Sequence, residues 1–231
     1  MVSTVAGKIA ECMTLKFNII SAANEIPSDG TDWLLAIPPT STWSRLRHAR
    51  NGGPPPLRDI DWPWGFPWAV GRDRTKLDNE NHHINLLLEV FKRARALSPH
   101  ALLTLLHPED LGNSTTGRPA SLWQLPEIRK LATDLGLLRG ALFQCNFGFS
   151  RHAFPMGLLT SHSLGSGRIK RGWPLFRGDA KETYIGPLPS QCECGTPHGA
   201  NYTRSKGHES LLTPDFMMFL AGKGLSLTMT L

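Results

Sequence analysis

The stretch Trp33-Leu34-Leu35-Ala36-Ile37-Pro38-Pro39-Thr40-Ser41-Thr42-Trp43-Ser44-Arg45 joins a short apolar run to a loop of prolines and hydroxyl residues. The apolar run predicts a buried strand over Asp32–Ile37. Each proline ring fixes φ near −65°, so the chain leaves this strand with a rigid backbone. Ligands bind at the carboxyl ends of the strands in open α/β sheets, so the exit is predicted to carry a functional site.

Helices and strands are predicted to alternate after this loop. Apolar residues at helical spacing indicate helices over Asn81–Leu97 and Leu125–Leu137. Continuous apolar runs indicate strands over Ala101–Leu106 and Ala141–Cys145. This alternation predicts an α/β fold that is Rossmann-like, with a mostly parallel sheet and helices on both faces.

Two parts of different texture are expected along the chain. Residues 1–164 are predicted to form the α/β core, beginning with a helix at 6–16 and a strand at Phe17–Ser21. Residues 165–231 are irregular and contain cysteine and histidine, and Pro214–Gly222 is predicted to close the chain as a helix.

The chain is basic, with a formal net charge of +6 over 231 residues. Arg45, Arg47 and Arg58 lie close together in sequence and are predicted to contact phosphate groups, which would make a nucleic acid the partner. The simpler alternative is a mildly basic soluble protein whose arginines lie at a solvated surface. Trp64, with its neighbours Trp62 and Trp68, can either stack on a base or pack the long proline-rich loop onto the core.

Four cysteines are too few for a disulfide scaffold in a chain of this length, which favours a reducing, intracellular compartment, nuclear or cytoplasmic. No apolar run has the length of a membrane span, and no signal peptide is expected. Cys192, Cys194 and His198 are residue types that bind zinc, and Cys145, His152 or His208 can supply a fourth ligand. Free thiols in a Gly-Pro loop are the alternative.

The order of these motifs resembles the cytosine-5 DNA methyltransferases, which carry a Pro-Cys-x-x-Phe-Ser type loop after a strand. Here the frame is Pro39-Thr40-Ser41-Thr42-Trp43-Ser44. A closer similarity is to the methyltransferase-like proteins found with retroelements and in algal and fungal genomes. The matching motifs are Pro38-Pro39-Thr40, Ser44-Arg45-Leu46-Arg47, Gly53-Pro54-Pro55-Pro56-Leu57-Arg58, Pro63-Trp64-Gly65, His107-Pro108-Glu109-Asp110, Ser121-Leu122-Trp123, Gly186-Pro187-Leu188-Pro189 and Cys192-x-Cys194-Gly195.

Two departures from that family concern its covalent chemistry. Thr40 stands where the family has its attacking thiol, and Leu106 stands where it has its acid. A hydroxyl without an adjacent base is a much weaker nucleophile than a thiolate. The resemblance therefore implies that any remaining chemistry lies nearest to Thr40, Ser41, Ser44, Glu109 and Asp110.

The resemblance also implies S-adenosylmethionine as the cofactor. Its contacts would be Gly7, the ribose acid Glu25, and Pro38 with Pro39. The family's first strand has no counterpart before Gly7, so the chain is similar to an N-terminally incomplete, degenerate member. Two hypotheses follow: a catalytically impaired DNA methyltransferase-like protein that uses S-adenosylmethionine, or a non-catalytic nucleic-acid-binding remnant of a mobile-element protein.

Overall fold

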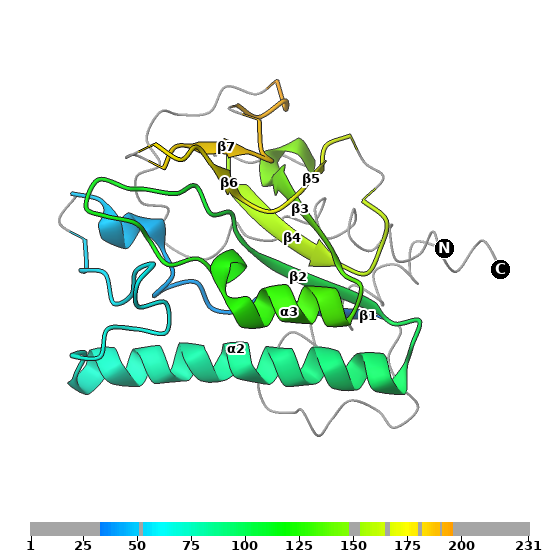
Figure 1. Cartoon of the computed structure of the whole chain (residues 1–231), viewed down its shortest axis with the longest axis horizontal. Coiled ribbons are helices and arrows are strands. Elements are labelled where there is room, and N and C mark those ends of the chain that lie inside the picture. The colour runs from blue at the N-terminus through cyan, green and yellow to red at the C-terminus, as the bar shows by residue number, and fades with distance from the viewer. Residues whose placement is uncertain are drawn as a thin grey trace, which may run out of the picture.

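A five-stranded sheet with two helices forms the centre of the protein in a computed structural model (Figure 1). The structure describes residues 33–50, 53–147, 153–164, 167–179, 182–189 and 191–195. The helix expected at 6–16, the strand at Phe17–Ser21 and the helix at Pro214–Gly222 lie outside these residues. Within them, no helix combines the length and the apolar character needed to cross a membrane.

The sheet is mixed, with strand order β1-β2-β4-β3-β5. Its strands are β1 (Trp33–Ala36), β2 (Leu102–Pro108), β3 (Leu138–Phe143), β4 (Pro155–Thr160) and β5 (Lys170–Arg171). β1 and β2 pair in parallel, whereas the other three pairings are antiparallel. The α/β class is confirmed, but the expectation of a mostly parallel sheet is wrong for the described residues.

The insertion of β4 explains this difference. β4 pairs antiparallel with both β2 and β3 and therefore lies between them. Because β4 is antiparallel to both neighbours, β2 and β3 still run in one direction, and β1 shares it. Its sequence, Pro-Met-Gly-Leu-Leu-Thr, is short and contains glycine, so it gave only a weak strand signal.

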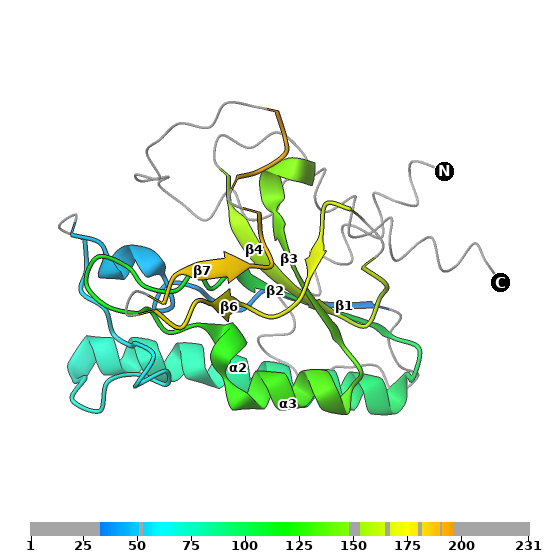
Figure 2. The ribbon, with the colours of Figure 1, turned by 45° about the horizontal axis from the view of Figure 1, so that its top comes forward.

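The two described α-helices lie on the same face of the sheet (Figures 1 and 2), not on both faces as expected. They are α2 (Gly71–Leu97) and α3 (Pro126–Asp134). One apolar cluster joins both helices to side chains of β1, β2 and β4. α2 begins ten residues before the predicted start. The prediction missed Gly71–Glu80 because this stretch is mostly polar and buries only Leu77 and Glu80.

The strands alternate between two buried faces. Leu103 and Leu105 of β2 face the helices, whereas Leu106 packs with Leu35 and Leu158 in a second cluster on the opposite face. Leu106, for which the sequence resemblance implies the acid position, thus points away from the helix face. The β2 residue that follows it, His107, lies on the helix face between two tryptophans.

Short elements complete the described chain. A two-stranded sheet pairs β6 (Leu175–Phe176) with β7 (Tyr184–Gly186). Three short 3-10 helices are η1 (Arg45–His48), η2 (Leu122–Gln124) and η3 (Gln144–Phe147). β5 pairs with β3, so residues beyond 164 extend the same sheet.

Candidate functional site at the carboxyl ends of β1 and β2

A small pocket lies where the two parallel strands end. It has a volume of about 40 Å³ and is lined by the β1 loop, the end of β2 and the segment before η2, through Trp43, Arg45, His107, Pro108, Glu109, Asp110, Leu111, Gly112, Pro119, Ala120 and Ser121. Ala36 of β1 pairs with Leu105 of β2, which brings the two strand ends side by side. The structure thus brings Arg45, Glu109 and Asp110 together, and Thr40 is not among the residues lining the pocket.

Glu80 of α2 holds the β1 loop in place. Its carboxylate accepts hydrogen bonds from the Ser41 hydroxyl, the Thr42 hydroxyl and the Thr42 backbone N–H, the last at 3.0 Å. Glu80 is buried, although it is charged and lies in the polar first half of α2. The predicted loop hydroxyls therefore have structural partners, and Ser44 caps η1 by accepting from Leu46 N at 3.3 Å. Sequence reasoning missed Glu80 because nothing marks it among the charged residues around it.

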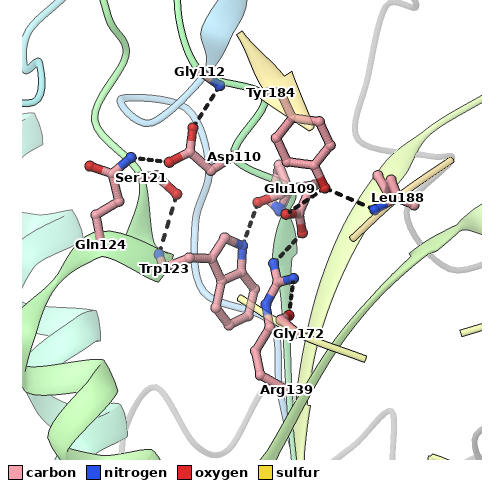
Figure 3. A network of polar contacts seen from close by, with 11 residues as sticks. Glu109, Asp110, Gly112, Ser121, Trp123, Gln124, Arg139, Gly172, Tyr184 and Leu188 are labelled. Atoms are coloured by element: carbon pink, nitrogen blue, oxygen red, sulfur yellow. Dashed lines mark hydrogen bonds and ion pairs between the residues drawn. The ribbon is translucent and has the colours of Figure 1, made fainter. Parts of the chain in front are cut away.

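A buried ion pair between Glu109 and Arg139 of β3 forms the centre of a polar network (Figure 3). The Tyr184 hydroxyl donates to Glu109 Oε1 at 3.2 Å and accepts from Leu188 N at 3.0 Å. Arg139 also donates to the Gly172 carbonyl at 2.9 Å. Burial raises the pKa of Glu109 to about 7, outweighing the opposing attraction of Arg139.

Asp110 is likewise bound to the protein. It accepts from Gly112 N at 2.9 Å and from the Gln124 side chain (Figure 3), and burial raises its pKa. Gly112 has φ +72°, and a Cβ there would lie 2.9 Å from the Glu182 carbonyl oxygen. The turn after Asp110 therefore requires glycine. The two predicted carboxylates are thus close to the pocket, but their oxygens already accept hydrogen bonds.

Cationic and aromatic side chains are stacked next to the pocket, and two of them, Trp43 and His107, line it. Arg58 stacks over Trp43 at 3.9 Å, and Arg139 stacks over Trp123 at 4.7 Å. Between the two indoles lies His107, in edge contacts with ring centroids 6.0 and 6.3 Å away. Trp123 Nε1 donates to the Pro108 carbonyl at 2.7 Å. The guanidinium groups of both arginines are thus buried against indole rings.

His107 is one of the polar residues that line the pocket. Burial lowers its pKa to about 3, so the imidazole is neutral. Within the described residues, neither His107 ring nitrogen nor Trp43 Nε1 has a hydrogen-bond partner. These atoms can offer hydrogen bonds to a small polar occupant, but a neutral imidazole of such low pKa is a weak base.

The predicted phosphate-binding arginines are used inside the protein. Arg58 is 0% exposed and donates to the Pro63 carbonyl at 2.7 Å and to Asn81 at 3.0 Å. Because Arg58 is buried, it cannot contact phosphate at the protein surface, and that prediction is wrong. Arg47 donates to the Ser41 and Pro55 carbonyls at 2.6 and 2.7 Å, and exposed Arg45 donates to Gly112 and Asn113.

The exposed tryptophans of the proline-rich loop are the neighbours of Trp64, not Trp64 itself. Trp64 is half-buried and packs on the core, whereas Trp62 and Trp68 are 45% and 65% exposed. Phe66 and Trp68 stack with centroids 4.8 Å apart and planes 8° from parallel, and Trp62 meets Trp68 edge-on at 6.1 Å. Sequence reasoning named Trp62 and Trp68 only as neighbours of Trp64, because all three stand in the same Trp-Pro context.

Three of the predicted metal ligands come together. Cys145 of η3 and the two cysteines of the 191–195 segment place their sulfur atoms within 4.8 Å of one another. Burial raises the pKa of the Cys145 thiol, as do its neighbours Cys192 and Cys194. His198, like the implied cofactor residues Gly7 and Glu25, lies outside the described residues.

The pocket of about 40 Å³ between the ends of β1 and β2 is small beside the about 300–1,000 Å³ of typical small-molecule pockets. Of the contacts implied for S-adenosylmethionine, Pro38 and Pro39 are buried and half-buried, whereas Gly7 and Glu25 lie outside the described residues. Comparisons with models of protein families, with curated proteins and with solved structures find no match to this chain.

Proposed function

We propose that this chain is a nucleic-acid-binding protein on a methyltransferase-like, Rossmann-like frame, and that it does not perform the cytosine-5 reaction. The single observation that carries the proposal is the aromatic platform just before α2, in which Trp62 and Trp68 are 45% and 65% exposed and the half-buried Phe66 stacks on Trp68. The frame is supported by the common direction of β1, β2 and β3 and by the pocket at the ends of β1 and β2.

The state of the pocket argues against catalysis. Covalent attack on a base needs an activated nucleophile and an acid at the same place. The Ser41 and Thr42 hydroxyls of the β1 loop donate to Glu80, and Glu109 is paired with Arg139. Thr40 is not among the residues that line the pocket. The polar groups of this edge thus stabilise the fold instead of presenting reactive atoms.

The platform has the chemistry of a single-strand binding surface. Aromatic rings that expose a face stack on bases of any sequence, each stack contributing about 1–3 kcal/mol. Arg72 and Arg74 are exposed in the first turn of α2, where a cation is disfavoured by the helix dipole. Arg74 pairs with Asp78 at 2.9 Å, which leaves Arg72 as the cation for a phosphate. The N-cap, Val70, gives the helix no side-chain hydrogen bond, so a phosphate oxygen can accept from the first N–H groups.

The proposal is tested by titrating a fluorescent single-stranded DNA oligonucleotide and its RNA counterpart with the full chain at several salt concentrations. Binding should weaken with salt, with a slope of about −0.7 per phosphate contacted. Quenching of tryptophan fluorescence should accompany binding, because bases stack on the platform. An affinity that is absent or independent of salt would contradict nucleic-acid binding.

The catalytic hypothesis is tested separately. Isothermal calorimetry with millimolar S-adenosylmethionine should show no heat of binding, and incubation with labelled cofactor and DNA should transfer no methyl groups. Methyl transfer that is lost in Thr40→Ala but kept in Ser44→Ala would overturn the non-catalytic part of the proposal and leave the binding part standing.

A further inference from the structure

The cysteines form a cluster away from the β1–β2 pocket that the proposed function does not use. Cys145 is buried in η3, directly after β3, whereas Cys192 and Cys194 come from an irregular segment about fifty residues later in the chain. Their three sulfur atoms lie within 4.8 Å of one another, and the two in the later segment are 3.4 Å apart. Three thiols from two distant segments thus meet at one point.

The spacing of the sulfurs matches a zinc–thiolate site. Zn–S bonds of about 2.3 Å in a tetrahedron place sulfur atoms about 3.8 Å apart, which is slightly more than the 3.4 Å between Cys192 and Cys194 and below the 4.8 Å limit for all three sulfurs. Thiolates are soft ligands that select zinc over magnesium or calcium. A disulfide could join only two of the three sulfurs, and residues two apart in sequence make a poor pair for one. Lys170 of β5 has its Nζ 3.9 Å from the carboxylate of Glu193, the residue between the two later cysteines.

We propose that Cys145, Cys192 and Cys194 bind one zinc ion that fastens the 191–195 segment to the end of β3. Structural zinc is four-coordinate, so one further ligand is required. That position falls to water or to a residue outside the described chain, where the sequence predicts His198. In this role the ion would stabilise the fold by linking two segments that are distant in sequence.

The zinc site would also support the Glu109 network. Leu188 packs in the same apolar cluster as Cys145, with Tyr184 and the two later cysteines against it. Leu188 N donates to the Tyr184 hydroxyl, and Tyr184 donates to Glu109. Zinc would thus hold in place the segment that completes the hydrogen bonds of a buried carboxylate. Chelation should therefore lower the melting temperature of the folded chain.

The test measures metal content in the full chain, purified by gel filtration after growth with added zinc. Wild type should carry about one zinc per chain, and Cys145→Ser and Cys192→Ser should each carry less than about a tenth of an equivalent. Glu89→Ala, at an exposed position of α2, is the control: it leaves the three cysteines in place and should keep the full zinc content and the full loss of melting temperature on chelation.

Cobalt substitution gives a second readout that does not depend on how the variants fold. Wild-type protein titrated with Co²⁺ should develop sulfur-to-cobalt charge-transfer absorption and the visible bands of a tetrahedral site, and both should disappear when zinc is added. Wild type that binds less than about a tenth of an equivalent of zinc, or cobalt spectra without sulfur charge transfer, would overturn the proposal. So would full zinc content in both cluster variants. None of these outcomes depends on nucleic-acid binding.

Discussion

Tryptophan and arginine side chains come together in two regions of this protein, and the regions differ in their access to water. Behind the β1–β2 pocket, Trp43 with Arg58 and Trp123 with Arg139 are buried, and each arginine stacks on its indole. At the start of α2, Trp62 and Trp68 are exposed, and the nearby Arg72 is exposed as well. The same residue types thus stabilise the fold in one region and are available to a partner in the other.

The difference shows that Trp and Arg in one loop do not by themselves mark a binding surface. Arg58 and Trp62 are four residues apart in sequence, yet the first is fully buried and the second is 45% exposed. Buried guanidinium groups require carbonyl, carboxylate or aromatic partners inside the protein, which Arg58 and Arg139 have. Substitutions in either region test whether its tryptophan and arginine side chains have the role given to them.

The largest effect is expected for Arg139→Met. The variant leaves the buried Glu109 carboxylate without its cation, which should lower the free energy of unfolding by about 3–5 kcal/mol at pH 8. Urea denaturation of the full chain measures this change. Arg74→Met is the matched control, because the Arg74–Asp78 pair is exposed and should contribute less than about 1 kcal/mol. Equal losses in the two variants would show that the Glu109–Arg139 pair is not buried in solution.

The second prediction concerns pH. Burial raises the pKa of Glu109 from 4.5 to about 7, so the folded chain binds a proton more tightly than the unfolded chain. The free energy of unfolding should then fall as pH rises from about 4.5 to 7, by up to about 3 kcal/mol, and level off above that range.

The pH prediction is checked with Glu109→Gln. In this variant the decline should be much smaller, and Asp110, whose pKa burial also raises, should keep a weaker slope of the same sign. For the same reason the loss caused by Arg139→Met should shrink at pH 5, where Glu109 is protonated. A wild-type stability that rises between pH 5 and 7 would contradict the burial of Glu109.

A third change tests whether α2 holds the β1 loop. Glu80→Ala removes the acceptor for Ser41 and Thr42 and leaves the buried Thr42 N–H without a partner, at a cost of about 2–3 kcal/mol. Glu89→Ala, at an exposed position of the same helix, should change stability by less than about 0.5 kcal/mol. Urea denaturation compares the two, and similar values would remove Glu80 from the role given to it.

The smallest change in stability and a clear change in binding are expected for Trp68→Ala. The exposed ring contributes little to the fold, so stability should stay within about 0.5 kcal/mol of wild type. Its loss should weaken oligonucleotide binding about 5–150-fold, corresponding to about 1–3 kcal/mol of stacking. Ile185→Ala, another exposed apolar position, serves as the control and should bind as wild type does. Unchanged affinity in Trp68→Ala would exclude the platform as the binding surface.

Several elements of the fold could be predicted from the sequence because their apolar patterns are local. The strand at Trp33–Ala36 and the helix ending at Leu97 agree with their patterns, and β2, β3 and α3 differ from theirs by a few residues at the ends. The first ten residues of α2 were not predicted, since a polar turn that buries only Leu77 and Glu80 has no visible period. The position of β4 could not be predicted either, because strand order depends on non-local pairing.

The two strand exits that form the pocket and the cysteines that can bind a metal could be predicted from the sequence, since each follows from residue type and spacing. Which arginines and tryptophans face water, and which partner each carboxylate has, became known only from the folded structure. The reason is physical: burial and pairing depend on residues far apart in the chain, as when Arg139 meets Glu109 or Cys145 meets Cys192.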